Sequence, residues 1–563
     1  YCDEQTESCA PCVCNPGELG SCLNENQIEV CNDACGGYDP QDCVGQVCVV
    51  DACVDLICVP NEPTCEDNNT YKLCNDKGTD FLPPVDCQPG DVCVNGTCVS
   101  ACEAAASQKS NIGCEFWAVD MDNLPPRDKY TYAVALSNPS FTDTVNVEIY
   151  DRNNNNNEQK IITGTIAARQ VKVFNLSGSH NGYTSFYNGQ DAGFLDDGIA
   201  LGRAFRVKTD LPVLATQFNP IGGASGYTTD ASLLLPTHTL GKAYYHMAWT
   251  NGYGNGSAMN IVATEDNTTV TITPKVNTQA GKNGLPAMAA NVPTQIKIGR
   301  YDYIQVMSGT NGPDLSGSKI EASAPVAVFG GHSCANVPTT SIAACDHIEE
   351  QILPLETWGK NYIAVRNPPR PENNPEDMVW RIIAAEDNTT VTFDPPVTIG
   401  AMTNLSAGQM VQFVDKKSFS VSANDPILVV GYMIGCTGTS IYPQQCDGDP
   451  YMVQMVAVEQ YLKDYVFLID SSYTKDFAQL IRPAGKAVDV GCLGVVPENR
   501  WTAVGKSGYD VATIDMNPGE ANCKPGTNEA SSDAGFGIVV SGRAYAASYA
   551  YPGGLALQVI NPQ

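Results

Sequence analysis

Short runs that alternate polar and apolar residues dominate the chain beyond Cys114. In Thr269–Thr273, Val145–Ile149 and Gln295–Ile298, every second residue is apolar. Such alternation places one face of a strand against a core and the other face in solvent. Helical periodicity of 3.6 residues is not sustained here, so the pattern predicts an all-β region.

Uncharged apolar runs that follow a proline form a second class of predicted strand. Pro212–Ala215, Pro325–Phe329 and Pro426–Val430 are three copies, and Arg543–Tyr549 takes the same place near the end of the chain without the proline. Proline lacks an N–H, so it is tolerated just before a strand. The absence of charge favours strands that are buried on both faces.

Longer strings also repeat. Ala263–Thr271 reads ATEDNTTVT and Ala385–Thr392 reads AEDNTTVT, while Gly-Lys-x-Tyr at Gly241–Tyr244 recurs at Gly359–Tyr362 and, more weakly, within Val458–Tyr465. Asp and Asn before Thr-Thr-Val-Thr are turn residues that lead into a strand. The period of about 105 to 120 residues indicates a duplicated structural unit.

Four copies of this unit fit the chain. The predicted β units cover residues 112–234, 235–352, 353–455 and 456–563. A unit of roughly 100 residues with six or seven short strands favours tandem β-sandwich, Ig-like units. A propeller-like closed β array is the alternative, although a propeller blade needs only four strands.

The N-terminal part is rich in cysteine instead. Eighteen of the 24 cysteines lie in the first 114 residues, and the spacing from Cys22 to Cys53 recurs from Cys65 to Cys98. This predicts two disulfide-rich modules, residues 1–60 and 61–111, which together form a stalk. A zinc site at Cys9-Ala-Pro-Cys12 is the weaker alternative, since only one such tight pair occurs.

The remaining six cysteines follow the repeat. Each of the first two candidate pairs comes directly after an uncharged apolar strand, and the third bridges a longer excursion in the last unit. Closing a loop of about ten residues stabilises a fold by roughly 2–3 kcal/mol. The candidate disulfide partners are Cys334 with Cys345, Cys436 with Cys446, and Cys492 with Cys523.

The chain is strongly acidic. It carries 62 Asp and Glu against 32 Lys and Arg, a formal net charge of −30, which argues against nucleic acid or an anionic membrane as a direct partner. The apolar runs are too short to span a bilayer. The disulfide-rich stalk indicates an oxidising compartment, so we expect a secreted or cell-surface protein whose signal peptide has already been removed.

Few residues of the sequence suggest a catalytic or metal-binding site. The sequence contains no nucleophile elbow, HExxH helix or phosphate-binding glycine loop, so we expect no catalytic residue, no cofactor site and no enzyme activity. His332 and His347 lie near Cys334 and Cys345, but oxidised cysteines cannot bind a metal.

Three acidic clusters offer oxygen ligands to Ca²⁺. They are Asp120–Asn123, Asp196–Gly198 and Asp447–Asp449. None has the spacing of a full EF-hand, so turn chemistry is favoured over calcium binding.

The string from Cys345 to Lys360, with the Pro325–Gly331 strand and the EDNTTVT strings, resembles the IgGFc-binding protein N-terminal domain family over about residues 112 to 560. The Cys-rich lead-in resembles those of secreted bacterial members. The resemblance implies an extracellular adhesive or matrix-like role without catalysis. It does not carry Fc binding to this chain, because no motif here corresponds to an Fc-contact site.

Two functional hypotheses follow. The first is a non-enzymatic extracellular structural or adhesion protein that binds copies of itself and assembles into a fibre or surface layer through exposed strand edges. The second is a secreted binding module for a glycoprotein or glycan at a surface, for which Tyr and Trp side chains would stack on sugars.

Overall fold

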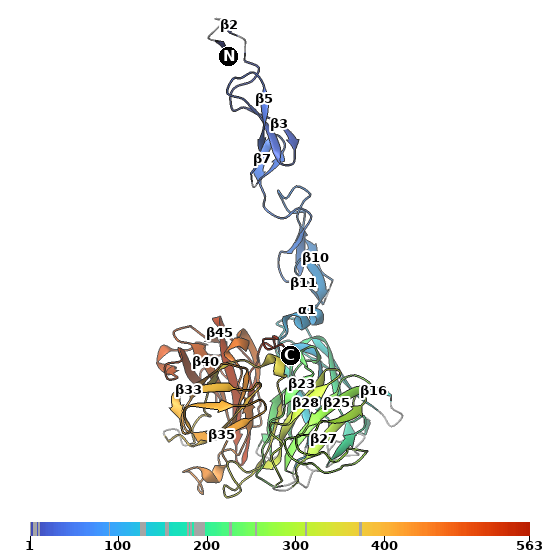
Figure 1. Ribbon diagram of the computed structural model, residues 1–563, viewed down its shortest axis with the longest axis vertical. Coiled ribbons are helices and arrows are strands. Elements are labelled where there is room, and N and C mark those ends of the chain that lie inside the picture. Colours follow the sequence, from blue (N-terminus) through green and yellow to red (C-terminus); the bar gives the residue numbers. More distant parts are fainter. Residues whose placement is uncertain are drawn as a thin grey trace. The chain divides into compact units, whose positions relative to one another are not determined.

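The computed structural model describes residues 2–3, 8–9, 12–44, 46–88, 90–123, 131–152, 157–176, 179–180, 183–184, 197–223, 228–253, 256–309, 312–370 and 374–562. The chain divides into two compact parts, which we call the N-terminal segment (Tyr1–Ala104) and the C-terminal region (Ala105–Gln563). Figure 1 shows the elements of both parts, coloured along the sequence. Among the described residues, no helix is both long enough and apolar enough to cross a membrane.

The N-terminal segment repeats one small arrangement of strands. A three-stranded sheet, β3-β4-β5, is followed by the two-stranded sheet β6-β7, and then β8-β9-β10 is followed by β11-β12. The bounds are β1 Cys2–Asp3, β2 Ser8–Cys9, β3 Leu19–Asn24, β4 Gln27–Cys31, β5 Tyr38–Asp42, β6 Gln46–Val49, β7 Ala52–Asp55, β8 Pro63–Cys65, β9 Thr70–Leu73, β10 Val85–Asp86, β11 Asp91–Val94 and β12 Thr97–Ser100, followed by helix α1 Ala101–Gln108.

Disulfides connect these small sheets in a repeated pattern. The equivalent bonds are Cys14–Cys31 and Cys58–Cys74, Cys22–Cys48 and Cys65–Cys93, and Cys43–Cys53 and Cys87–Cys98. Cys35, which has no counterpart in the second cysteine run, bonds to Cys12. The sulfur of Cys12 is therefore not available to zinc. Few buried aliphatic side chains support these short strands, so cross-linking takes the place of a large core.

The C-terminal region contains four pairs of sheets with one topology, which we number first to fourth along the chain. In each pair, an outer sheet and an inner sheet share a continuous or interrupted strand. The outer sheets have the orders β13-β21-β15-β16, β23-β28-β25-β26, β31-β36-β33-β34 and β39-β45-β41-β42. The inner sheets have the orders β17-β14-β21-β22, β27-β24-β29-β30, β35-β32-β37-β38 and β44-β40-β45-β46.

The strand bounds are as follows. In the first pair they are β13 Gly113–Ala118, β14 Ala133–Ser137, β15 Val145–Arg152, β16 Glu158–Ile166, β17 Val171–Asn175, β21 Phe205–Asn219 and β22 Asp230–Leu233, with β18 Ser179–His180 and β19 Tyr183–Thr184 forming a separate ladder. In the second they are β23 Ala243–Tyr245, β24 Ser257–Ala263, β25 Thr268–Thr273, β26 Thr294–Ile298, β27 Tyr303–Met307, β28 Lys319–Ala322, β29 Val326–Ala335 and β30 Asp346–Gln351, and β20 Gly198–Ala200 is added beside β27.

In the third pair they are β31 Asn361–Ala364, β32 Met378–Ala384, β33 Thr389–Val397, β34 Gly400–Leu405, β35 Met410–Asp415, β36 Phe419–Ala423, β37 Ile427–Met433 and β38 Met452–Gln454. In the fourth they are β39 Leu462–Ile469, β40 Lys475–Pro483, β41 Asp489–Val490, β42 Gly494–Val495, β44 Tyr509–Asn517, β45 Gly526–Ala544 and β46 Ala547–Pro552, and β43 Thr502–Ala503 is added beside β44. The 3-10 helices are η3 Thr237–Thr239, η4 Leu355–Thr357, η5 Cys436–Gly438, η6 Val458–Gln460 and η7 Glu498–Arg500.

Proline marks the point where the chain crosses from the outer to the inner sheet. Pro325 lies between β28 and β29, and Pro426 lies between β36 and β37. Because proline cannot donate a ladder hydrogen bond, the strand is interrupted at these two positions, whereas in the first pair Pro212 lies within β21, which continues past it. The fourth pair has no proline at this position, and β45 continues through both sheets for 19 residues.

Burial separates the two layers. Outer strand β25 alternates buried and partly exposed residues, whereas inner strands β24 and β29 are buried along their whole length. The all-β expectation and the strands buried on both faces are thus confirmed. The propeller-like closed array is wrong, because each pair consists of two layered sheets of at least four strands, with one strand shared by both sheets in the first and fourth pairs, where a propeller blade would be one radial sheet.

The repeated Gly-Lys-x-Tyr string has a defined role at the start of a sheet pair. In the second pair, the hydroxyl of Tyr244 accepts the N–H of Gly241 at 2.9 Å and donates to the carbonyl of Val326 at 2.7 Å. The same two bonds recur at Tyr362, with Gly359 and Ile427, and at Tyr465, with Leu462 and Phe536. In these three pairs the tyrosine therefore ties the entry of the pair to the start of its inner strand.

The EDNTT string forms a tight turn before a strand. Asn267 and Asn388 both have left-handed backbone, with φ of 61° and 60°. The following threonine donates its hydroxyl proton to the carbonyl of the glutamate three residues earlier, at 2.7 Å in both copies. Asn tolerates this conformation better than most residues, which explains its place in the string.

Candidate functional site

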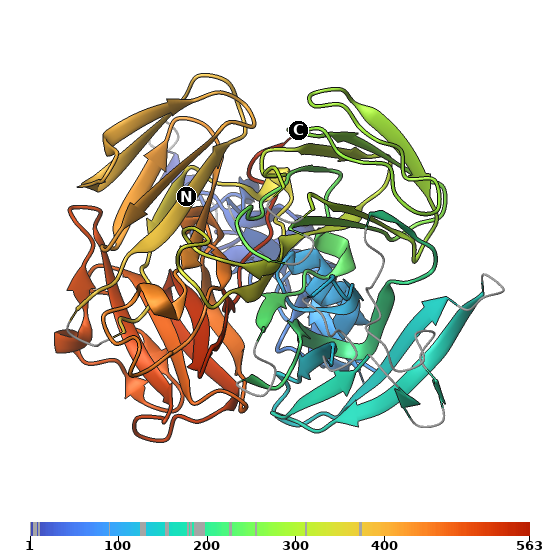
Figure 2. The same ribbon diagram turned by 90° about the horizontal axis from the view of Figure 1, so that it is seen from below.

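Four short strands, one from each inner sheet, meet in the middle of the C-terminal region. These central strands are β22, β30, β38 and β46, and they contact one another without forming a common ladder. Figure 2 shows the four sheet pairs arranged around them. Strands that approach in this way leave backbone N–H groups without a ladder partner, and buried N–H groups require an acceptor.

Asp230, at the start of β22, supplies that acceptor for all four central strands. Its Oδ1 accepts the N–H groups of Ala231 (2.9 Å) and Ala550 (3.3 Å). Its Oδ2 accepts those of Glu349 (3.1 Å) and Met452 (3.2 Å). One side chain thus joins residues of all four sheet pairs.

Three further carboxyl groups of β30 lie in the same polar centre. Asp346 accepts N–H groups from Thr229 and Ser548, and Glu350 accepts the Ser232 hydroxyl at 2.9 Å. Burial raises the pKa of Asp346, Glu349 and Glu350 well above the usual range. Their side chains have at most 1% of their surface exposed, so no substrate reaches them, and their role is architectural.

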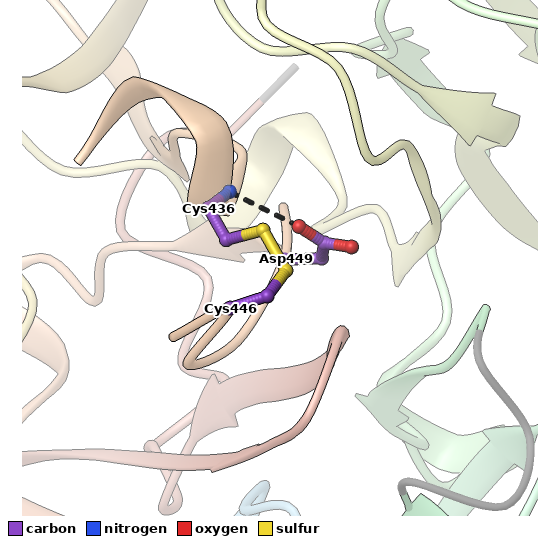
Figure 3. Close-up of side chains that lie close together, drawn as sticks. All are labelled: Cys436, Cys446 and Asp449. Atoms are coloured by element: carbon purple, nitrogen blue, oxygen red, sulfur yellow. Dashed lines mark hydrogen bonds between the residues drawn. A yellow bond between two sulfur atoms is a disulfide. The ribbon is translucent and has the colours of Figure 1, made fainter. Parts of the chain in front are cut away.

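Among the residues that the structure describes, one group of potential metal ligands is brought together, at the corner that follows β37. Figure 3 shows Cys436, Cys446 and Asp449 side by side. The two sulfur atoms are bonded to each other, and Asp449 Oδ1 accepts the N–H of Cys436 at 3.1 Å. Cystine sulfur is not the thiolate that a metal needs, so this group does not bind an ion.

The structure places all six predicted loop cysteines in disulfides. Cys334 is joined to Cys345, Cys436 to Cys446, and Cys492 to Cys523. The first two bonds occupy equivalent corners, at the end of β29, which contains Cys334, and after β37. They close loops of 11 and 10 residues, and the third closes one of 31.

The histidines near Cys334 and Cys345 are buried. Nδ1 of His332 accepts the N–H of Cys334 at 2.9 Å, and burial lowers the pKa of His332 to about 3. His347 Nε2 lies 3.5 Å from Oε2 of Glu349. Neither histidine is exposed to solvent.

The predicted calcium clusters are engaged in contacts within the protein. Asn123 is buried and donates to the carbonyl of Thr228 at 3.1 Å, and Asp197 accepts the N–H of Met307 at 2.7 Å. Asp447 pairs with Lys475 at 2.8 Å. Asp196 lies outside the described residues.

A cleft of about 600 Å³ opens between the third and fourth sheet pairs. Its third-pair wall comes from the loop after β31, the segment before β32, the β33 strand and the β35–β36 turn. Its fourth-pair wall comes from η7, β43, β44 and the turn between these two strands. This volume is typical of small-molecule sites. The lining residues are Val365–Pro369, Pro375, Pro395, Lys416–Ser418, Gln479, Arg500, Thr502–Gly505 and Val511–Thr513.

Arg366 is the most deeply placed cation of this cleft. Its guanidinium makes one hydrogen bond, from Nη1 to the carbonyl of Asn367 at 3.1 Å. Burial lowers the pKa of Arg366, and Glu376 only partly offsets this because its carboxylate bonds Arg370 and Asn367. No described carboxylate forms an ion pair with Arg366.

The other three cations of the cleft differ in how far they are neutralised. Lys417 donates to the carbonyl of Pro396 at 3.1 Å and forms no ion pair with a described residue. Lys416 is 4.0 Å from Asp377, both well exposed, which is a weak contact. Arg500 donates to both carboxylate oxygens of Glu520, at 2.7 and 3.0 Å, so its charge is neutralised and it contributes only to the shape of the cleft wall.

Sequence reasoning did not find the cleft. Arg366 and Lys417 are 51 positions apart in a chain that contains 32 Lys and Arg, and Thr513 belongs to a different repeat. The adjacent bases at Lys416 and Lys417 are the only local signal, and a pair of lysines in a turn is ordinarily a solvated surface.

The family comparison concerns the part of the chain that contains the cleft. The profile of a family described as IgGFc binding protein matches residues 230–542. The IgGFc-binding protein of Homo sapiens is 28% identical over 341 residues, which are 60% of this chain and 6% of the human protein. The chain therefore spans only a small part of that relative's length. No solved structure matches the chain.

Proposed function

Because this chain belongs to the IgGFc binding protein family, we propose that it is an extracellular binding protein that performs no catalysis. The disulfides of both parts support an oxidising compartment. The carboxyl and histidine side chains of the polar centre are engaged in packing and hydrogen bonding, which leaves no exposed acid–base pair among them.

The partner is a secreted glycoprotein or its glycan, bound by the C-terminal region. The observation that carries this proposal is the extent of the family match, since residues 230–542 include every residue that lines the cleft. The human relative is named for binding IgG Fc, which makes Fc the first protein to test. Since the chain spans 6% of that relative, Fc binding is itself a proposal.

Biolayer interferometry tests the proposed function. The purified full chain is immobilised, and IgG Fc, a mucin-type glycoprotein and their enzymatically deglycosylated forms are passed over it. We expect saturable binding to at least one glycoprotein, with serum albumin as the non-glycosylated control. Binding that is absent for all of them, or equal for albumin, would contradict the proposal.

Self-association into a fibre or surface layer is a second proposal. The outer strand β34 supports it, because it ends its sheet and most of its residues are exposed. An exposed edge offers unpaired N–H and C=O groups to another chain. We expect concentration-dependent oligomers in analytical ultracentrifugation and ordered assemblies in electron micrographs, and dispersed monomers at high concentration would remove the proposal.

A further inference from the structure

The cleft between the third and fourth sheet pairs has a charge opposite to that of the chain as a whole. Acidic residues outnumber basic ones 62 to 32 in the sequence. The described residues that line the cleft include Arg366, Lys416 and Lys417, together with Arg500, which is paired with Glu520, and no described lining residue is Asp or Glu. A local reversal of this kind concentrates anions at the cleft while the surrounding surface repels them.

Arg366 has donors to spare. A guanidinium carries five N–H donors, and Arg366 uses one of them on a carbonyl oxygen. Partial burial without a carboxylate partner among the described residues disfavours the charged form of this side chain, and a bound anion would relieve that penalty. Carboxylate and sulfate groups match the guanidinium fork in a bidentate arrangement.

The loop around Arg366 is held in place by the opposite wall. Gln479 of β40 donates to the carbonyl of Arg366 at 2.8 Å, and the N–H of Arg366 donates to the Ser418 hydroxyl at 3.2 Å. The arginine is therefore anchored at both backbone groups, and its side chain is presented from a fixed loop. Fixed donors lose less entropy when a ligand binds.

The walls favour a saccharide over an extended peptide. Four of the lining residues are proline, which has no N–H to offer a peptide strand, and the edge strand β43 has only two residues. Hydroxyl and amide groups of Ser418, Thr502, Thr513 and Gln479 lie among the lining residues. Such groups exchange hydrogen bonds with sugar hydroxyls, and the volume of about 600 Å³ accommodates a short oligosaccharide.

We propose that this cleft binds an acidic saccharide, one that carries a carboxylate or sulfate group, with Arg366 receiving the anion and Lys417 adding a second positive charge. The inference rests on the proposed function and names the ligand class of one site within it. Aromatic side chains are absent from the described lining, so charge supplies most of the affinity. Binding should accordingly weaken as salt concentration rises.

Isothermal titration calorimetry of the full chain at low salt tests this inference. The probes are 3′-sialyllactose, 6-sulfated lactose, neutral lactose and an acidic hexapeptide. We expect the two acidic sugars to bind at least roughly tenfold more tightly than lactose, the factor that one charge-assisted hydrogen bond supplies. Tighter binding of the peptide than of either acidic sugar would overturn the proposal in favour of a protein ligand.

Substitutions in the cleft test which residues cause the preference for acidic sugars. We expect Arg366→Gln to weaken the acidic sugars by roughly tenfold or more, Arg366→Lys to weaken them less, and Lys417→Gln to weaken them several-fold. Lys242→Gln, which removes an exposed lysine of the second sheet pair, is the matched control and should leave affinity unchanged. Lys417 is exposed, so its variant folds normally and keeps the test decisive if Arg366→Gln does not fold.

The two proposals fail in different ways. If the cleft variants bind acidic sugars as wild type does, or if acidic sugars bind no better than lactose, the cleft assignment is wrong. A glycoprotein that still binds the full chain in that case leaves the proposed function intact. Acidic sugars that bind at the cleft while no glycoprotein is retained would contradict the glycoprotein part of the proposed function and leave its glycan part.

Discussion

Substituting Asp230 by Asn tests whether one side chain holds the four sheet pairs together. Asn retains one acceptor oxygen, which replaces Oδ1 toward Ala231 and Ala550. Its amide nitrogen replaces Oδ2 and directs N–H groups at the N–H groups of Glu349 and Met452, which lie 3.1 and 3.2 Å from that oxygen in the wild type. The two opposed donors would lose their only acceptor in the polar centre.

The magnitude follows from these two donors. Each buried N–H that loses its partner costs about 1–3 kcal/mol, so Asp230→Asn should lower the free energy of unfolding by about 2–6 kcal/mol. A typical domain is stable by roughly 5–15 kcal/mol, so the effect is large enough to measure. The variant is neutral and nearly isosteric, which separates the hydrogen bonds from packing.

Urea unfolding followed by tryptophan fluorescence is a suitable assay, because all five tryptophans belong to the C-terminal region. Asp464→Asn removes an exposed carboxylate of β39 and is the matched control, expected within about 0.5 kcal/mol of wild type. An unchanged midpoint for Asp230→Asn would refute the reasoning. Burial raises the pKa of Asp230 well above its usual range although its backbone N–H bonds oppose this shift, so an unchanged midpoint would mean that the protonated form already prevails.

Three further outcomes are expected. Tyr362→Phe should lower stability by about 1–3 kcal/mol because it removes both bonds of the buried hydroxyl, and urea unfolding should show no such loss for the exposed Tyr253→Phe. Burial raises the pKa of Asp476 to about 7, so the stability associated with its protonated form is complete below about pH 4. This stability is lost as pH rises toward 7, by about 1.4 kcal/mol per pH unit. Thermal melts across this range should show a shallower dependence of stability on pH for Asp476→Asn, and an equal dependence would contradict this. Reduction of the disulfides should make the N-terminal segment susceptible to trypsin while the C-terminal region survives, as mass spectrometry of the fragments would show; loss of both parts together would contradict the division into two compact parts.

The fold class was predictable because its signals are local. Alternation at Thr269–Thr273 depends only on which side of β25 faces the core, and a proline before an apolar run depends only on the missing N–H. The EDNTT string likewise encodes a turn within itself. These patterns distinguish strand from helix without knowledge of the partner strand.

The polar centre and the cleft were not predictable because their geometry joins distant repeats. Asp230 reads as an ordinary turn or strand-edge residue in the sequence, yet one of its donors, Ala550, is 320 residues away. Arg366 stands in a proline-rich loop whose meaning depends on β40 and β43 of the next sheet pair. A single sequence carries no signal for such contacts.

The hydrogen bonds of Asp230 have a consequence for folding during translation. Asp230 leaves the ribosome long before Ala550 is translated, so its carboxyl group lacks one of its four N–H partners until the fourth sheet pair emerges. The first three sheet pairs should then remain loosely associated during translation. Segment Lys109–Asn111 likewise cannot form its backbone hydrogen bonds early, because their partners, Leu555 and Leu557, are translated more than 440 positions later. Maturation of the whole C-terminal region should therefore be a late, concerted step, and premature termination should yield products that the cell's quality control removes.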